Sequence, residues 1–371
     1  MVMRCPAEIG MSEAEVDTPA LLVDLDAYEA NLRLMAELTE GKVRVRPHAK
    51  THKSPVIALH QIAQGAVGMC CQKVDEAIAL VDGGVRDVLV SNQVVGAAKV
   101  LRLAALARRA RIGVCVDARE QVEALAEAVE RMGSSLDVLV EIDVGSRRCG
   151  VEPGEPALRL AERVEEEKGL RFGGLQAYYG SAQHIRDPGE RREAVKRAAG
   201  LAGDTVLLLD RYGLRCDTVG GAGTGTFADE IELGAINEIQ PGSYIFMDGD
   251  YRRNRVEGAP TYERFAQSLF VLSTVMSTRP EHAVTDAGLK ALSVDSGLPD
   301  VHARSGSLYT GASDEHGVIT HADGRPFQLG ERVRLIPGHC DPTVNLYDWY
   351  VGVRTGRVEA IWPIPARGAL H

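Results

Sequence analysis

The chain has 371 residues, of which 45% are hydrophobic and 25% are charged, and this is the composition of a globular protein with a sizeable core. Its formal net charge is −10 and no basic run interrupts the acidic average, so we expect small-molecule ligands and no nucleic-acid partner. Residues 1–17 lack the apolar stretch of a signal peptide, and no window reaches the roughly 18 to 20 apolar residues of a membrane helix, so no membrane contact is expected.

The seven cysteines are odd in number and form no C-x-x-C pair. This usage argues against a disulfide framework and favours reduced, mostly buried thiols. Reduced thiols are typical of a cytoplasmic protein, which is the location we expect.

From residue 18 onward, short apolar runs alternate with polar loops and helix-period segments, a rhythm typical of β/α units around a parallel sheet. Strands are expected at 20–23, 43–46, 67–70, 88–90, 112–116, 136–142, 172–178 and 218–219, with helices at about 73–82, 96–109, 119–132, 155–168 and 189–213. Eight such units within residues 18–255 predict a closed (β/α)8 barrel. An open doubly wound sheet is the alternative, but its glycine fingerprint would follow the first strand, whereas here the glycines come last.

After about residue 255 the rhythm changes to short strands without strong helices. They are expected at 268–276, 283–285, 332–336, 350–353 and 357–362, with a hairpin turn at 354–356. We therefore predict a C-terminal all-β domain over residues 256–371, with residues 1–17 as a candidate addition to it.

Lys50 lies in a polar stretch directly after the expected second strand, with the sequence RPHAKTHK over residues 46–53. Barrel enzymes keep their active sites at the carboxyl ends of the strands. His48, His52 and Lys53 are cationic neighbours that would lower the pKa of Lys50, and a neutral amine is the nucleophile that forms a Schiff base. Lys50 is therefore the candidate catalytic lysine, and a surface cluster of basic side chains is the alternative.

A glycine-rich stretch, GGAGTGT over residues 220–226, directly follows the expected eighth strand. Barrels commonly bind a phosphate at this position, through backbone amides and hydroxyls that glycine lets approach closely. Gly223, Thr224 and Gly225 are the candidate phosphate-binding residues, although tight turns alone would also require glycines. Together with Lys50 they would supply both anchors of pyridoxal 5′-phosphate.

His339 and Asp341 flank Cys340 in the sequence GHCDP. In an extended segment alternate side chains share a face, so His339 and Asp341 could bind one cation while Cys340 points elsewhere. Imidazole with carboxylate suits a divalent ion such as Mn or Mg. The alternative is an ordinary turn beside a proline.

Two further side chains follow expected barrel strands. His184 comes after the strand that ends near Tyr178, where its imidazole could act as a general base. Arg148 and its neighbour Arg147 follow the sixth strand, where a guanidinium could bind a carboxylate or a phenolate oxygen. An exposed histidine and an exposed basic pair are the alternatives.

These motifs in combination resemble the D-threonine aldolase and 3-hydroxy-D-aspartate aldolase group of alanine racemase-like, fold-type III pyridoxal phosphate enzymes. The resemblance rests on 17–19 (DTP), 46–50 (RPHAK), 70–74 (CCQKV), 220–225, 242–244 (GSY), 286–290 (DAGLK), 314–317 (DEHG) and 338–343 (GHCDPT). It implies a barrel with a β-domain, a homodimer, Lys50 as the Schiff-base lysine and His339 with Asp341 as metal ligands. It also implies His184 as the base, Arg148 and Tyr178 at the cofactor, and Gly223, Thr224 and Tyr244 near its phosphate.

The resemblance implies cleavage of a D-3-hydroxy amino acid, such as D-threonine or D-3-hydroxyaspartate, to glycine and an aldehyde. Related dehydratases, which yield a 2-oxo acid and ammonia, typically carry cysteine two residues after the metal histidine and hold zinc. Here that position is Asp341, which favours the aldolases and a harder ion than zinc. A dehydratase and a non-catalytic pyridoxal phosphate-binding protein remain the alternatives.

Overall fold

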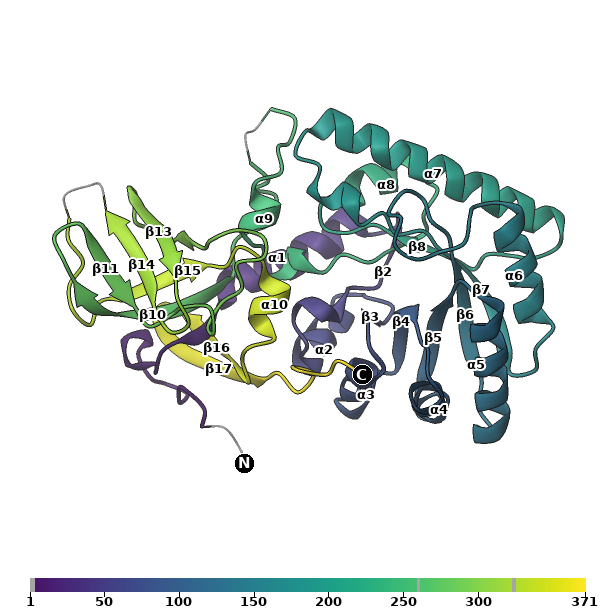
Figure 1. Ribbon diagram of the computed structural model, residues 1–371, viewed down its shortest axis with the longest axis horizontal. Coiled ribbons are helices and arrows are strands. Elements are labelled where there is room, and N and C mark those ends of the chain that lie inside the picture. The colour runs from purple at the N-terminus through teal and green to yellow at the C-terminus, as the bar shows by residue number, and fades with distance from the viewer. Residues whose placement is uncertain (1–3, 259–260, 322–324) are drawn as a thin grey trace.

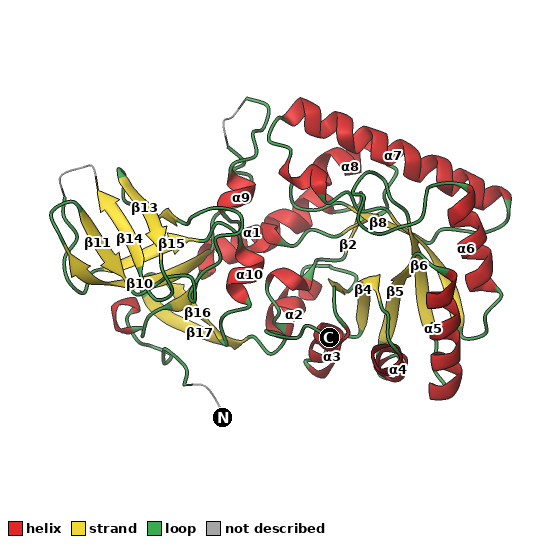
Figure 2. Cartoon of the chain, viewed as in Figure 1, coloured by secondary structure: helices red, strands yellow, loops and turns green. Residues whose placement is uncertain are grey.

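The computed structural model describes residues 4–258, 261–321 and 325–371. It contains two sheets: one of eight parallel strands surrounded by helices, and one of nine strands beside it (Figure 1). In Figure 2 the helices cover the outside of the first sheet, whereas the second sheet forms most of the other lobe. The predicted combination of a (β/α)8 barrel and an all-β domain is confirmed.

The barrel runs in the order β2-β9-β8-β7-β6-β5-β4-β3. Its strands are β2 (Arg44–Val45), β3 (Met69–Cys71), β4 (Asp87–Gln93), β5 (Arg111–Val116), β6 (Leu136–Glu141), β7 (Leu170–Gln176), β8 (Thr218–Gly221) and β9 (Glu238–Ile239). A parallel bridge between His48 and Cys70 joins the two ends of this order, and the amide of Val67 donates to the carbonyl of Val45 over 2.9 Å. The sheet is therefore closed.

The assignment of the first expected strand, 20–23, to the barrel is wrong. Strand β1 (Ala20–Asp24) pairs antiparallel with β10 and parallel with β16, so it belongs to the second sheet. The strand that completes the barrel is β9, which the sequence pattern missed. Lys50 consequently follows the first strand of the barrel rather than the second, and the glycine-rich stretch follows the seventh.

Most of the helices connect barrel strands, while the first leads from β1 of the second sheet into β2 and the last follows β9. They are α1 (Leu25–Thr39), α2 (Pro55–Ala63), α3 (Val74–Asp82), α4 (Ala97–Leu106), α5 (Arg119–Met132), α6 (Glu155–Glu165), α7 (Pro188–Arg211), α8 (Phe227–Leu233) and α9 (Gly249–Arg252). The long helix α7 begins where Asp187 accepts hydrogen bonds from the amides of Gly189 and Glu190, with Pro188 at the first helical position. Inside the barrel, Cys70, Leu89, Cys115 and Leu139 form a buried cluster.

The second sheet has the order β13-β14-β11-β10-β1-β16-β17, with β15 pairing to β10 and β12. Its later strands are β10 (Leu269–Thr278), β11 (His282–Thr285), β12 (Asp300–Val301), β13 (Ser307–Ala312), β14 (Gly317–His321), β15 (Arg332–Ile336), β16 (Trp349–Arg354) and β17 (Arg357–Pro363), and α10 (Cys340–Val344) follows β15. Arg334 pairs with Glu13, so the segment before β1 also packs on this sheet. All seven cysteines are free thiols.

The amino ends of the barrel strands carry alternating charges, which we call the basal ring. Arg111 Nε and Arg171 Nε each lie 2.7 Å from a carboxylate oxygen of Asp137, and Arg46 Nε lies 2.8 Å from Glu238 Oε1. The ring consists of Arg46, Asp87, Arg111, Asp137, Arg171, Asp217, Arg44 and Glu238.

Candidate active site

Lys50 lies at the carboxyl end of the barrel, in the short 3-10 helix Ala49–Thr51 that follows β2. Its Nζ is 3.7 Å from Asp341 Oδ2, and its side chain is 40% exposed. The lysine of the barrel and the carboxylate of the second domain therefore face one another where the two domains meet.

Buried contacts fix the loop around Lys50. The Lys53 ammonium donates to the Glu76 carboxylate on α3, and the Tyr350 hydroxyl donates to the carbonyl of His52 over 2.7 Å. Ser54 Oγ donates to the carbonyl of Pro363 over 2.8 Å. The second domain thus clamps the loop that carries the lysine.

The electrostatics of Lys50 differ from the expectation. Burial lowers the pKa values of His48 and His52, that of His52 to about 3, so both imidazoles are neutral. The ammonium of Lys53 is directed to Glu76. Burial also lowers the pKa of Lys50, but Asp341 and Tyr178 raise it more, and the net direction is upward. The expected lowering by cationic neighbours is wrong for the chain without a cofactor.

Arg148 and Tyr178 stand at the same end of the barrel, after β6 and β7. The Arg148 guanidinium lies 5.8 Å from the centroid of the Tyr178 ring, and its Nη2 is 3.8 Å from Glu141 Oε1. Burial raises the pKa of Tyr178, although Lys50 and Arg148 oppose this. A protonated phenol and a weakly paired guanidinium are thus available near the amine of Lys50.

The glycine-rich loop after β8 packs against Gln183. A Cβ at position 223 would lie 2.5 Å from Gln183 Oε1, so a larger residue there would have to displace the side-chain amide of Gln183. The amide of Gly225 donates to Gln183 Oε1 over 3.0 Å, and the amide of Gly223 donates to Thr226 Oγ1 over 3.3 Å. Both of these amides already have partners within the chain.

Thr224 and Tyr244 join this loop to the segment after β9. The amide of Tyr244 donates to Thr224 Oγ1 over 3.0 Å, and Gln61 Nε2 donates to the Tyr244 hydroxyl over 3.0 Å. Both residues are buried. These contacts connect the glycine-rich loop to the segment after β9 and to Gln61 of α2.

His339 and Asp341 come together as the sequence predicted, but on a different backbone. His339 is extended, whereas Cys340 begins helix α10, whose first turn contains Pro342. His339 Nε2 lies 4.0 Å from Asp341 Oδ2, and His339 Nδ1 lies 2.8 Å from Asp295 Oδ2. The Cys340 thiol is buried and 3.7 Å from Ser243 Oγ, and burial raises its pKa. The expected extended strand is wrong, and the thiol does not point away from the pair, because its Sγ lies 3.4 Å from Asp341 Oδ1.

His184 ends a 3-10 helix (Ser181–His184) after β7. Its side chain is 53% exposed, and its Nδ1 lies 2.6 Å from Asp250 Oδ2. Sequence reasoning missed both Asp250 and Asp295, the partners of the two site histidines. The acidic residues of 248–250 were a faint signal for Asp250, whereas nothing around Asp295 marks it.

The donor set fits both groups that the resemblance implies. Two atoms that bind one ion at about 2.1 Å lie no more than about 4.2 Å apart, which the imidazole and carboxylate atoms already satisfy. A second carboxylate on Nδ1 is the usual support of a metal-binding histidine, and Asp295 supplies it. No group of three potential metal-ligating side chains occurs among the described residues, so water and substrate would complete the shell. For the cofactor, an accessible amine and a guanidinium lie at one end of the barrel, and the glycine-rich loop follows β8 at the same end, with its amides at 223 and 225 bonded within the chain.

None of the helices among the described residues combines the length and the apolar character needed to cross a membrane.

Comparison with known proteins places this arrangement in a family. The family described as "Alanine racemase, N-terminal domain" matches residues 23–250, and "Putative serine dehydratase domain" matches residues 268–353. A D-threonine aldolase of Arthrobacter sp is 47% identical, covering 98% of this chain and 96% of its own, and a 3-hydroxy-D-aspartate aldolase of Paracoccus denitrificans (strain Pd 1222) is 45% identical, covering 98% and 95%.

A solved D-threonine aldolase from Filomicrobium marinum superimposes with a TM-score of 0.96 and 50% identity, covering 99% of this chain and 100% of that one. A D-threo-3-hydroxyaspartate dehydratase of Delftia sp. (strain HT23) is more distant, at 30% identity over 94% of this chain and 97% of its own. The chain therefore belongs to the alanine racemase-like family, within the group of D-threonine aldolase and 3-hydroxy-D-aspartate aldolase.

Proposed function

We propose that this protein is a pyridoxal phosphate- and divalent metal-dependent aldolase that cleaves D-3-hydroxy amino acids to glycine and an aldehyde. The observation that carries the proposal is the approach of Lys50 Nζ to within 3.7 Å of Asp341 Oδ2, because it puts the amine beside the metal-binding pair. Close similarity to two aldolases, against lower similarity to a dehydratase, supports the same reaction class.

The reaction breaks the bond between Cα and Cβ of the substrate. The β-hydroxyl loses its proton and its oxygen becomes the aldehyde oxygen, while Cα takes up a proton and becomes the methylene carbon of glycine. When bound, the cofactor supplies an electron sink for the charge left on Cα, and the metal ion lowers the pKa of the β-hydroxyl.

Side chains of the protein bind the two groups and transfer the proton. Lys50 would hold the aldehyde of the cofactor, and His339 with Asp341 would hold the metal ion. The imidazole of His184 accepts the hydroxyl proton as a general base. Arg148 and Tyr178 would hold the cofactor ring, and Gly223, Thr224, Gly225 and Tyr244 would hold its phosphate.

The metal is proposed to be Mn or Mg rather than Zn, since the pair offers imidazole and carboxylate without a thiolate. The buried, protonated Cys340 agrees with this choice. Activity restored to metal-stripped protein by Mn or Mg, and less by Zn, is the expected outcome, and restoration by Zn alone would reverse the assignment.

A homodimer is proposed from membership of this group. Light scattering on protein eluting from a sizing column measures its mass directly. Twice the chain mass is the expected result, and a single chain mass would contradict the assignment.

Product identification tests the reaction. Protein loaded with pyridoxal phosphate and Mn or Mg is incubated with D-threonine and then with D-3-hydroxyaspartate. Glycine with acetaldehyde or glyoxylate is the expected result and ranks the two substrates. A 2-oxo acid with ammonia would instead identify a dehydratase, and no product with a retained cofactor would identify a binding protein.

A further inference from the structure

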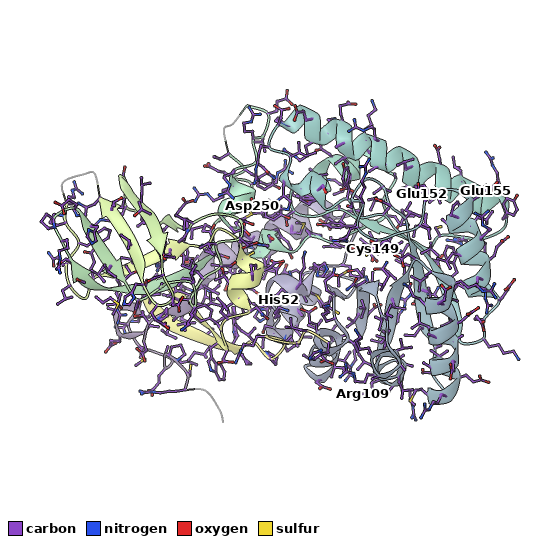
Figure 3. All side chains as sticks on the ribbon, in the orientation of Figure 1. His52, Arg109, Cys149, Glu152, Glu155 and Asp250 are labelled. Carbon is purple, nitrogen blue, oxygen red and sulfur yellow. The ribbon has the colours of Figure 1, made fainter. Side chains whose placement is uncertain are left out.

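Asp250, at the start of the short helix α9, is a buried carboxylate at the junction of the barrel and the second domain (Figure 3). Its side chain is 7% exposed, and Oδ2 lies 2.6 Å from Nδ1 of His184. Nδ1 of His184 is thus bonded to a buried carboxylate, while the exposed part of the ring remains accessible to a substrate.

The ionisation of Asp250 decides which nitrogen of His184 carries the hydrogen. Burial raises the pKa of Asp250, but hydrogen bonds from His184, Arg186 and Arg253 outweigh it and hold the pKa below its usual range. An ionised carboxylate can only accept a hydrogen bond, so Nδ1 must be the donor. In the neutral imidazole Nε2 then keeps its lone pair, which a general base requires.

The same residue is bonded to the segment that leads into the metal-binding pair. The amide of Asp250 donates to the carbonyl of Gly338 over 2.9 Å, and the amide of Gly249 donates to the carbonyl of Pro337 over 3.0 Å. Asp248, which precedes Gly249, accepts a hydrogen bond through Oδ2 from the amide of Cys340 over 3.1 Å. Gly338 directly precedes His339, so Asp250 links the proposed base to the proposed metal ligand.

We infer that Asp250 is a positioning residue, which fixes the Nδ1–H tautomer of His184 and its distance from His339 and Asp341. The inference rests on the proposed function, because it needs His184 to act as the base. It goes beyond that function by assigning a buried carboxylate to the proton transfer.

A purely structural ion pair is the competing role for Asp250. The charged groups that face it are Arg186, which also donates to Asn254 Oδ1 over 2.6 Å, and Arg253, whose Nη2 is 3.0 Å from Asp250 Oδ1. The ring of Tyr251 packs beside His184 with centroids 6.2 Å apart. Loss of structural pairing alone would lower stability without changing the tautomer of His184.

The first test measures the tautomer in the protein free of cofactor and metal. Long-range proton–nitrogen spectra of protein labelled with 15N-histidine, recorded at pH 9, distinguish protonated from bare ring nitrogens, and His184→Gln identifies the signal. We expect protonated Nδ1 and bare Nε2 in the wild type, and a loss of this preference in Asp250→Asn. A wild-type ring protonated at Nε2 would overturn the inference even if the variant did not fold.

The second test compares Asp250→Asn with Asp187→Asn in the loaded enzyme. Asp187 pairs with Arg255 at 3.0 Å and caps α7, and asparagine caps a helix nearly as well, so this control removes one nearby negative charge without touching His184. We expect Asp250→Asn to lower kcat for D-threonine by about 100-fold or more with KM within about threefold, because a transition-state proton transfer is impaired. The control should retain its kcat.

A kcat for Asp250→Asn equal to that of the control would contradict the inference. Failure of the proposed function would look different, since the wild type would then release no glycine while the tautomer spectra could still be read.

Discussion

The two ends of the barrel use charged side chains in opposite ways. At the amino ends of the strands, the basal ring matches arginines with carboxylates around the rim, several of them within 2.8 Å. At the carboxyl ends, Lys50 has a carboxylate only at 3.7 Å and Arg148 only at 3.8 Å, whereas the half-exposed His184 is closely paired with Asp250, at 2.6 Å. Closely matched charges hold a structure, whereas loosely matched ones remain available for a ligand, so the comparison assigns stability to one end and chemistry to the other.

The largest effect is expected at Lys50. Lys50→Ala should lower turnover by roughly 10⁴-fold or more, because the cofactor loses its covalent attachment. Lys42→Ala is the control, since Lys42 is a lysine without a proposed role in the site, whose ammonium donates to the carbonyl of Leu38 at the exposed end of α1. Visible absorbance of the lysine-bound cofactor and the rate of glycine release measure both variants. Retained activity in Lys50→Ala would remove the chemistry from this end of the barrel.

His339→Ala should lower cleavage by roughly 100-fold or more, since a Lewis-acid ion contributes several kcal/mol. It should also abolish stoichiometric metal binding while the lysine-bound cofactor remains visible. His316→Ala changes an exposed imidazole in the turn between β13 and β14 and serves as the control. Elemental analysis and steady-state kinetics give the two readouts, and undiminished metal content in His339→Ala would refute the proposed site.

Substitutions in the basal ring should lower stability and leave activity unchanged. Glu238→Gln removes the buried charge that Arg46 and Arg44 face, so the free energy of unfolding should fall by about 3 to 5 kcal/mol. Asp217→Asn changes an exposed member of the same ring and should cost about 1 kcal/mol or less. Urea unfolding measures both. If Glu238→Gln lowered kcat instead of stability, the division between the two ends would be wrong.

A smaller effect is expected at Glu230 on α8, where burial raises the pKa to about 7. The folded protein then binds a proton that the unfolded chain has released, so stability falls as pH rises from about 4.5 to 7. Glu230→Gln should remove this loss and raise the free energy of unfolding at pH 8 by on the order of 3 kcal/mol. At pH 4 the variant and the wild type should be alike. Parallel stability curves between pH 4 and pH 8 would show that Glu230 has the same pKa in the folded and the unfolded chain.

The parts of the fold that local pattern determines were predictable. The apolar period marks α5, expected at 119–132 and observed over Arg119–Met132. The run at 20–23 was misassigned because it is followed by a helix like any β/α unit, yet its partners in β10 and β16 lie hundreds of residues away. Strand β9 has only two residues, which is too short to show a period.

The residues of the candidate site also fall into a predictable and an unpredictable group. Lys50, His339 and Asp341 stand in sequence motifs, and the structure brings the lysine and the carboxylate together. Asp250 and Asp295 act through contacts with residues 66 and 44 positions away, so no local pattern could reveal them. The helix at Cys340–Val344 could have been anticipated, since Pro342 suits the first turn of a helix better than the middle of a strand.

The most direct test of the central claim is to find which lysine holds the cofactor. The pyridoxal phosphate-loaded protein is reduced with borohydride, digested, and its labelled peptide is sequenced by mass spectrometry. We expect a label on Lys50, at the carboxyl end of the barrel. A label on Lys53, whose ammonium is committed to Glu76, or on a lysine elsewhere in the chain would contradict it.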